Sequence, residues 1–321
     1  MRRRALAAAL GLLPAAAAAQ PAWRPDHPVR LVVPFPPGGP TDLVARPLAQ
    51  RLTEALGQPV LADNRGGAGG NLAGELVARA APDGHTLLLS NVGVLAVNQA
   101  LYRTLPFDPE RDFTPVALVA GAPVALVVHP GVPARTVAEF VAWAKAQASP
   151  LPYASAGAGT PGHLAGELFR SLTGAPLQHA PYRGSAPALQ DVVAGYVRAM
   201  FDPVQSPLPQ IEAGRLRALA VSGASRSPAL PAVPTLAEAG VAGHDMVAWW
   251  AVVGPAGLPA PVVARLAGEI GRIAESADWQ ERLGRLGISP IFLGPEALAV
   301  FRRREAATWG EAVRASGAKA E

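Results

Sequence analysis

Apolar runs and amphipathic segments alternate along the first third of the chain, separated by Pro and Gly. The run VRLVVP at 29–34 is apolar on both faces of an extended segment, which is typical of a parallel strand covered by helices. A helix is predicted at 41–56, with Thr41 or Asp42 placed to cap it and Gly57 to end it. Strands at 59–64 and 86–91 enclose a second helix at 71–81. This order predicts an α/β domain with a mostly parallel sheet.

The same alternation returns later in the chain, where a capping box formed by Thr136 and Glu139 predicts the start of a helix. Before it, residues 115–130 hold two strand-like runs interrupted at Gly121, Ala122 and Pro123. We expect the chain to cross into a second domain at this interruption. That domain should contain helices at 136–147, 161–173, 185–194 and 204–213 and strands at 152–155, 178–182, 197–202 and 216–221.

The C-terminal part is expected to fold back on the first domain. It contains a strand-like run at 246–254, a short strand at 289–292, and helices at 261–274 and 295–316. The predicted lobes are therefore residues 26–124 plus 248–321 for lobe 1 and residues 125–247 for lobe 2. Two connections, near 121–126 and 244–250, would then form a two-strand hinge.

The N-terminus has the pattern of an export signal. Arg2, Arg3 and Arg4 precede an apolar run at 5–19 that ends in small residues. A membrane-spanning helix needs about 20 apolar residues, so this run is too short to span a bilayer. We predict a signal peptide at 1–19 that is cleaved from a periplasmic protein. The alternative is an uncleaved buried helix, and the Arg cluster leaves both Sec and twin-Arg export open.

Composition narrows the class of protein. Of the 321 residues, 50% are hydrophobic and 16% charged, which suits two packed domains better than a disordered chain. Removal of the predicted signal takes three Arg from the 28 Lys and Arg residues, which leaves 25 basic against 24 acidic residues. No basic patch with interleaved aromatic residues is present, so a nucleic-acid partner is not expected. The absence of Cys excludes disulfides and thiolate chemistry.

Enzyme and cofactor motifs are absent or incomplete. The chain has no HExxH, GxSxG or P-loop motif, and its six His residues do not have metal-ligand spacing. Gly157, Gly159 and Gly162 match GxGxxG, but the acid that a dinucleotide site has about 20 residues later is missing. The sequence therefore predicts no catalytic residue, no cofactor and no metal.

Two strand-to-helix turns, at 35–42 and 155–163, carry the candidate chemistry. Such a turn presents the first N–H groups of a helix, which favour an anion. Among the loops at 35–42, 90–93, 155–163 and 182–185 and the residues around Asp202, only Arg183 is cationic. We therefore expect the two turns to face each other across a cleft and to hold a carboxylate without a salt bridge. Hydroxyl donors are available at Thr41, Ser155 and Thr160.

Several of these residues also have a plainer interpretation. Thr41 and Asp42 could serve only as helix caps. His163 is more typical of a residue that supports a site than of a catalytic base. Trp249 and Trp250 alternate along one predicted strand, so one of them should face the core and the other the cleft.

Longer stretches of the chain resemble a known family. The segments RLVVPFPPGGPTDLVAR at 30–46, PYASAGAGTPGHLAGELF at 152–169 and HAPYRGSAPALQDVVAG at 179–195 are similar to the Bug-type periplasmic receptors of tripartite tricarboxylate transporters. These receptors are a branch of the type II periplasmic binding proteins. Further similar segments lie, in the family's order, at 63–91, 107–119, 214–240 and 254–263.

The resemblance implies a two-lobed α/β fold that closes on a small carboxylate, held largely by main-chain groups and ordered waters. The ligand contacts carried over from the family are Phe35, Gly38, Gly39, Thr41 and Asp42 on lobe 1, Ser155, Gly157, Thr160 and His163 on lobe 2, and Ser90, Tyr182 and Asp202 as further neighbours. Pro40 and Pro161 depart from this picture because neither has an N–H group to donate.

The resemblance also implies partners. A monomeric receptor would dock on a membrane permease made of one large and one small subunit. Di- and tricarboxylates, acidic amino acids and aromatic acids all remain open as ligands. Two other functions also stay open: an extracytoplasmic sensor for a membrane kinase, and a hydrolase that uses a Ser with His163.

Overall fold

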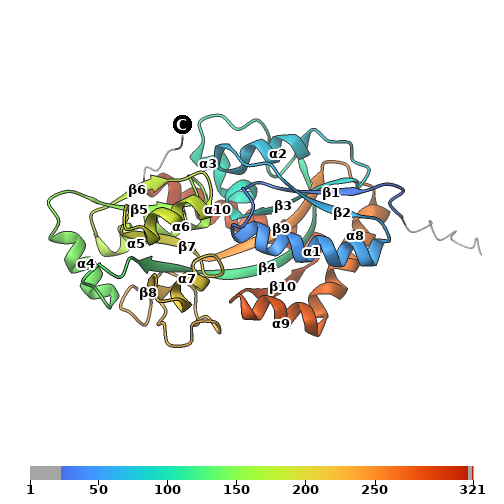
Figure 1. The fold of residues 1–321 in the computed structure, drawn as a ribbon. Helices are drawn as coiled ribbons and strands as arrows, with labels where there is room; N and C mark the ends of the chain where they lie inside the picture. The colour runs from blue at the N-terminus through green and yellow to red at the C-terminus, as the bar shows by residue number, and fades with distance from the viewer. Residues whose placement is uncertain (1–22, 317–319, 321) are drawn as a thin grey trace, which may run out of the picture.

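The computed structural model describes residues 23–316 and 320, so the predicted signal peptide at 1–19 lies outside the described residues. Two α/β lobes lie side by side (Figure 1). Lobe 1 is built on β1, β2, β3 and β10, lobe 2 on β5 to β8, and the long strands β4 and β9 run between them. None of the helices in the described part of the chain has both the length and the apolar character needed to cross a membrane.

Lobe 1 takes its elements from both ends of the chain. The N-terminal elements are β1 (Val29–Val33), α1 (Pro40–Leu56), β2 (Val60–Asn64), a short turn of helix at Ala68–Gly70, α2 (Asn71–Ala78), β3 (Thr86–Asn91), a π-helical turn at Gly93–Val97 and α3 (Asn98–Leu101). The C-terminal elements are β9 (Val247–Pro255), α8 (Ala260–Glu275), α9 (Ala277–Arg285), β10 (Ser289–Leu293) and α10 (Pro295–Ser316).

Lobe 2 is continuous in sequence. After β4 (Phe113–Val128) come α4 (Val137–Lys145), β5 (Leu151–Ser155), α5 (Pro161–Thr173), β6 (Leu177–Pro181), α6 (Ser185–Val193), β7 (Ala199–Pro203), α7 (Leu208–Glu212) and β8 (Arg217–Val221). The capping box predicted at Thr136 and Glu139 is present at the start of α4, because each residue bonds the backbone of the other.

In the described residues, ten strands form one sheet, whose main path runs β2-β1-β3-β9-β4-β7-β5-β6, with β8 and β10 also paired to β4. The outer strands β2-β1-β3 and β7-β5-β6 are parallel, because helices connect them as crossovers. The central strands β3, β9, β4 and β7 pair antiparallel. The predicted parallel sheet thus describes the two flanks, and antiparallel strands join them.

Strand β4 corrects the expectation of an interruption at 121–123, since it continues without a break from Phe113 to Val128. Its partner changes along its length: Pro123 pairs with Val247 of β9, and Val124 pairs with Pro203 of β7. Pro123 therefore falls at the end of one ladder, where a missing N–H is tolerated. The chain passes from one lobe to the other inside a strand and not through a loop.

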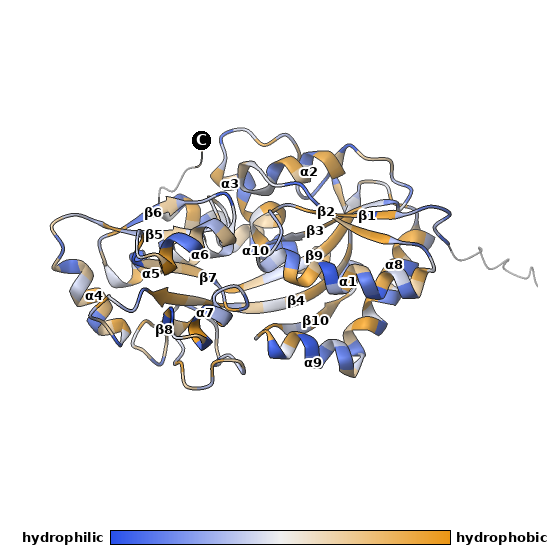
Figure 2. Ribbon diagram, in the orientation of Figure 1, coloured by the Kyte–Doolittle hydropathy of each residue, from blue (hydrophilic) through white to orange (hydrophobic). Residues whose placement is uncertain are grey.

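The core lies on both faces of this sheet. Large side chains that are fully buried include Leu31 and Leu48 in lobe 1, Tyr153 and Phe169 in lobe 2, and Trp250 between them. Figure 2 shows hydrophobic colour along the strands, whereas α1 and α9 alternate between hydrophilic and hydrophobic turns. The helices therefore bury one face on the sheet and expose the other.

Candidate functional site

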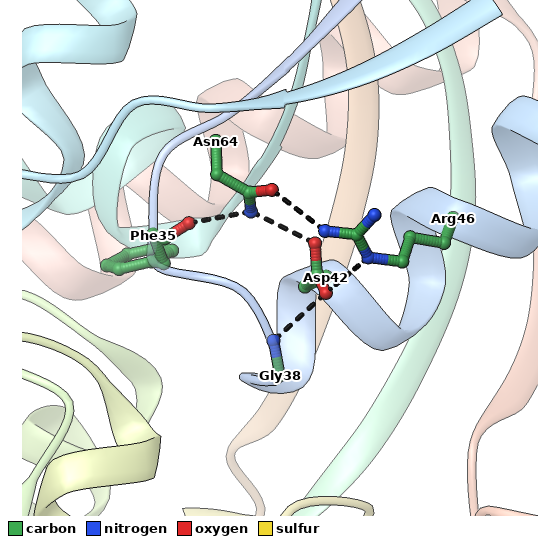
Figure 3. Close-up of polar contacts among 5 residues, drawn as sticks. All are labelled: Phe35, Gly38, Asp42, Arg46 and Asn64. Carbon is green, nitrogen blue, oxygen red and sulfur yellow. Dashed lines mark hydrogen bonds and ion pairs between the residues drawn. The ribbon is translucent and has the colours of Figure 1, made fainter.

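The turn between β1 and α1 is held by the carboxylate of Asp42 (Figure 3). Asp42 Oδ2 accepts hydrogen bonds from the Gly38 N–H at 2.9 Å and from Arg46 Nε at 2.8 Å, and Oδ1 accepts from Asn64 Nδ2 at 3.0 Å. Asn64 Nδ2 also donates to the Phe35 carbonyl at 2.9 Å. One buried carboxylate thus ties both ends of the turn to the neighbouring strand β2.

The ionisation of Asp42 follows from these contacts. Burial acts to raise the pKa of its carboxyl, but the donors on Arg46, Gly38 and Asn64 outweigh burial and hold the pKa below its usual value. The expectation that Thr41 or Asp42 caps α1 is corrected: the N-cap residue is Gly39, and no side chain caps the helix. Pro40 occupies the first helical position, where its missing N–H costs little.

A small cavity lies between the lobes, with about 310 Å³ of empty space, part of it open to solvent. Its lobe 1 wall is formed by Phe35, Gly39, Pro40, Thr41, Asn91 and Trp250, and its lobe 2 wall by Ala156, Thr160, Pro161, Ser185, Asp202 and Pro203. Neither Lys nor Arg is among these lining residues of the described chain. A ligand held here would meet main-chain, hydroxyl and amide groups and aromatic carbon, but no cationic side chain.

Three helices begin at this cavity. Helix α1 starts at Pro40, α5 at Pro161 and α6 at Ser185, and all three residues line the cavity. The N-terminus of each helix carries partial positive charge from N–H groups that have no partner within the helix. The sequence predicted all three helices but assigned the anion site only to the first two, and the start of α6 adds a further electropositive wall from lobe 2.

Side chains on the cavity wall are already partly engaged. Trp250 Nε1 donates to Thr41 Oγ1 at 3.0 Å, and Asn91 Oδ1 accepts from the Gly93 N–H at 3.0 Å. Thr160 Oγ1 donates to the Gly157 carbonyl at 2.7 Å. Trp250 is the tryptophan that faces the cleft, as predicted for one of the pair. These contacts fix the rotamers of the lining side chains before any ligand enters.

Asp202 is the one acidic side chain on the cavity wall of the described structure. The residue is 1% exposed, its Oδ1 accepts from Ser185 Oγ at 3.0 Å, and its Oδ2 has no hydrogen-bond partner among the described residues. Burial raises the pKa of this carboxyl to about 7, although the hydroxyls of Ser206 and Ser185 act to lower it. Burial beside the cavity therefore leaves a carboxyl group that can change its protonation state near neutral pH.

Behind the lobe 2 wall lies a neutral cluster. Ser155 Oγ lies 2.7 Å from His179 Nε2, and the His179 and His163 rings stack with centroids 4.1 Å apart. His163 Nδ1 accepts from the Gly159 N–H at 3.1 Å, so His163 supports the turn, as its plainer interpretation expected. Burial lowers the pKa of His163, and it lowers the pKa of His179 to about 3. Ser155 is fully buried and does not line the cavity.

The two lobes touch through glycines. A Cβ atom on Gly93 of lobe 1 would lie 2.4 Å from the Gly159 carbonyl oxygen of lobe 2, and one on Gly184 would lie 3.1 Å from Pro36 Cδ. Contacts this close leave no room for a side chain at Gly93. The absence of a side chain there lets the two lobes lie in contact.

A wider, open pocket with about 1350 Å³ of empty space, part of it open solvent, adjoins the cavity and shares Phe35 and Ala156 with it. Gly157 and Tyr182 line this outer pocket. The Tyr182 hydroxyl donates to Asp191 Oδ2 at 2.7 Å, and burial together with this carboxylate raises the pKa of Tyr182 to about 12. Residues of both lobes line this outer pocket.

One group of potential metal ligands lies elsewhere, at the start of the described chain. Asp26, His27 and His85 offer ligand atoms within 4.8 Å of one another, a grouping that sequence spacing did not reveal. The rings of His27 and His85 are stacked 3.6 Å apart at an angle of 5°. The lone pairs of parallel rings do not converge on one point, so this arrangement fits a pair of His–Asp contacts around Asp26 better than a metal site.

Comparison with known proteins identifies the family. The family model described as "Tripartite tricarboxylate transporter family receptor" matches residues 44–318. The chain belongs to this receptor family. The receptor is 37% identical to protein BugT of Bordetella pertussis over 296 residues, which cover 92% of this chain and 91% of BugT. The predicted Bug-type resemblance is thereby confirmed.

Solved structures also resemble this receptor. R. palustris Rpa4515 with adipate is 38% identical, with a TM-score of 0.89 over 91% of this chain and 98% of that one. MatC from Rhodopseudomonas palustris with bound malate is 36% identical, with a TM-score of 0.85 over 90% of this chain and 99% of that one. The two-lobed α/β periplasmic-binding-protein fold predicted from the sequence is confirmed.

The structure separates the predicted site residues of the receptor into three groups. Phe35, Gly39, Thr41, Thr160 and Asp202 line the inner cavity, and Gly157 and Tyr182 line only the outer pocket. The remaining five, Gly38, Asp42, Ser90, Ser155 and His163, line neither of these spaces. Sequence reasoning did not select Asn91 or Ser185 as contacts, although Asn91 ends a predicted strand and Ser185 lies in a predicted strand-end loop. It expected one of Trp249 and Trp250 at the cleft without choosing between them.

Proposed function

We propose that this receptor captures a small organic acid between its lobes in the periplasm and delivers it to a tripartite membrane transporter. The observation that carries the proposal is the cavity onto which three helices from two lobes direct their N-termini, without a Lys or Arg on its wall in the described structure. Such a cavity offers partial positive charge and hydrogen-bond donors to a carboxylate.

The physical argument concerns desolvation. A carboxylate that leaves water loses strong hydrogen bonds, and it binds only if the site replaces them. Helix N–H groups are fixed in place before binding, so they replace these bonds without reorganisation of long side chains. The related structures support this choice of ligand, since one is described with adipate and the other with malate, both dicarboxylates.

The proposed closing motion follows from the strand connections. We propose that residues 26–124 plus 248–321 move against residues 125–247, with the hinge in β4 near 121–126 and in the segment at 244–250 that leads into β9. Both lobes contribute to the cavity wall, so the cavity is complete only when they are closed. Closure would bury the ligand and create the surface that the permease recognises.

Binding can be tested with ligand-stripped receptor that has been unfolded, dialysed and refolded. A panel of mono-, di- and tricarboxylates is followed by thermal shift and by Trp fluorescence, which Trp250 on the cavity wall should report. We expect at least one carboxylate to raise the melting temperature and its diamide to have no effect. Stabilisation by uncharged solutes alone would contradict the proposal.

Delivery needs a separate test. The ligand-loaded receptor is added to vesicles that contain the large and small subunits of its own permease, and uptake of radiolabelled ligand is measured. We expect uptake only with the loaded receptor. A receptor that binds the acid tightly but promotes no uptake with its own permease would instead favour the sensor function.

A further inference from the structure

The two walls of the inner cavity have opposite hydrogen-bonding character in their side chains. On the lobe 1 wall, Thr41 accepts from Trp250 and so keeps its own hydroxyl proton for a ligand. Asn91 uses Oδ1 to accept from Gly93, which leaves its amide N–H groups directed to other acceptors. Together with the start of α1, this wall offers donors and suits a carboxylate.

On the lobe 2 wall the side chains offer acceptors. Asp202 Oδ2 is buried without a partner among the described residues, while Oδ1 is occupied by Ser185. Thr160 gives its proton to the Gly157 carbonyl at 2.7 Å, so its oxygen can only accept from a ligand. With Asp202 ionised, a second ligand carboxylate placed beside it would bring an acceptor to an acceptor and one negative charge to another.

We propose that the ligand carries, besides its carboxylate, a hydroxyl or ammonium group that donates a hydrogen bond to Asp202 Oδ2. The receptor would then select hydroxy- or amino-carboxylic acids over plain carboxylic acids of the same length. This inference rests on the proposed function, and it adds to that function the hydroxyl or ammonium group of the ligand that lobe 2 recognises.

The energetic reason is the unpaired acceptor. When Asp202 is ionised, a plain acid would leave its Oδ2 buried and unpaired, which is unfavourable, whereas a donor on the ligand satisfies it. A site built to bond a ligand hydroxyl or amine rejects the analogue that lacks it far more strongly than an apolar pocket distinguishes two shapes. The donor also favours the ionised form of Asp202, so its binding near neutral pH should release a proton.

The test uses matched acids that differ in one group. Succinate, malate and aspartate form one set, glutarate, 2-hydroxyglutarate and glutamate a second, and propionate, lactate and alanine a third. Each is titrated into ligand-stripped receptor by calorimetry, in two buffers with different ionisation enthalpies so that proton release is measured. In at least one set, the member with the donor should bind at least about tenfold tighter than the plain acid, with proton release. The hydroxy and amino members distinguish the two kinds of donor.

Variants assign the effect to Asp202. In Asp202→Asn an amide replaces Oδ2, and in Asp202→Ala both oxygens are lost, so both should reduce the preference to within about threefold, which is under 1 kcal/mol. Glu212→Gln removes an exposed charge from the same lobe, outside the cavity, and should keep the preference. Melting curves of the ligand-free variants verify that each one is folded.

Three results would overturn the inference. Equal binding of plain and donor-bearing acids would overturn it and leave the carboxylate receptor standing. A preference that survives in both folded Asp202 variants would remove Asp202 as its cause. If no organic acid in a broad panel binds at all, the proposed function fails together with the inference.

Discussion

The two strand-to-helix turns at the cavity have the same backbone plan but are stabilised differently. The lobe 1 turn is tied by an ionised carboxylate, Asp42, to Arg46 and Asn64. The lobe 2 turn is supported by His163, whose burial keeps it neutral and which accepts from the Gly159 N–H. A strand-to-helix turn can thus be stabilised either by charge-assisted hydrogen bonds or by neutral ones. The two turns should therefore lose stability in different pH ranges.

The largest loss of stability is expected when the charged carboxylate of Asp42 is removed. Asp42→Ala deletes an acceptor of three hydrogen bonds and should lower the free energy of unfolding of the ligand-free receptor by about 2–4 kcal/mol. Urea unfolding measures this change. Glu54→Ala on the same helix is the matched control, because Glu54 forms only a surface pair with Arg51 and should cost less than about 1 kcal/mol. Equal losses in the two variants would show that the Asp42 contacts do not stabilise the turn.

The next largest effect, on ligand affinity, is expected at the contact between the lobes. Gly93→Ala places a methyl group against the Gly159 carbonyl oxygen, so the lobes should be held apart and ligand affinity should fall by about 10- to 100-fold, or about 1.4–2.8 kcal/mol. Calorimetry with the best carboxylate measures the change. Gly284→Ala, on α9 with no atom near the added methyl group, should leave affinity unchanged. Unaltered affinity in Gly93→Ala would mean that closure at this contact is not needed.

Removal of the neutral His163 side chain should have a smaller effect on stability. His163→Ala leaves the Gly159 N–H without its acceptor and removes the ring that stacks on His179, which should lower the free energy of unfolding by about 1–2 kcal/mol. His129→Ala is a useful comparison, since His129 Nδ1 accepts from the Gly131 N–H in an exposed turn and water can replace it. We expect its loss to stay below about 0.5 kcal/mol.

The two turns should lose stability at different pH values as the solution is acidified. Burial lowers the pKa of His179 from 6.5 to about 3, so below pH 6.5 the unfolded chain binds a proton that the folded one does not, and stability falls as the pH falls through this window. The stabilisation from Asp42, whose pKa is also lowered, is lost only below its usual value of 3.8. One His of this kind should cost about 1 kcal/mol between pH 6.5 and 5.5.

The pH experiment needs one background change. Asp202 has a raised pKa, so its contribution to stability has the opposite sign and is lost as the pH rises toward 7. Urea unfolding is therefore compared in Asp202→Asn with and without His179→Gln, from pH 7 to pH 5. A loss of stability on acidification that is the same in both proteins would contradict the assignment to His179.

Much of the fold follows from local sequence. The helix at 161–173 and the strand at 86–91 were predicted with the bounds that the structure has, because Pro or Gly marks their limits and their apolar spacing is regular. The break predicted in β4 was wrong, because Pro123 was assumed to end the strand. Its position between two ladders depends on β9 and β7, which lie more than 70 residues away.

The site was harder to predict than the fold. Hydroxyl and glycine residues in the two turns indicated the cavity, and Thr41 and Thr160 do line it. The partner of Asp42 at Asn64 lies 22 residues away, and that of Ser185 at Asp202 lies 17 residues away, so neither pair is visible in a local pattern. Whether a polar side chain faces the ligand or its own turn depends on such distant partners.

The continuous strand β4 has a mechanical consequence. Its 16 residues extend for roughly 50 Å from lobe 1 into lobe 2 as one continuous hydrogen-bonded strand. Bending a continuous hydrogen-bonded strand costs free energy, in contrast to a change in the conformation of a flexible loop. Any change in the angle between the lobes must therefore bend this strand or break some of its hydrogen bonds, and either change costs free energy.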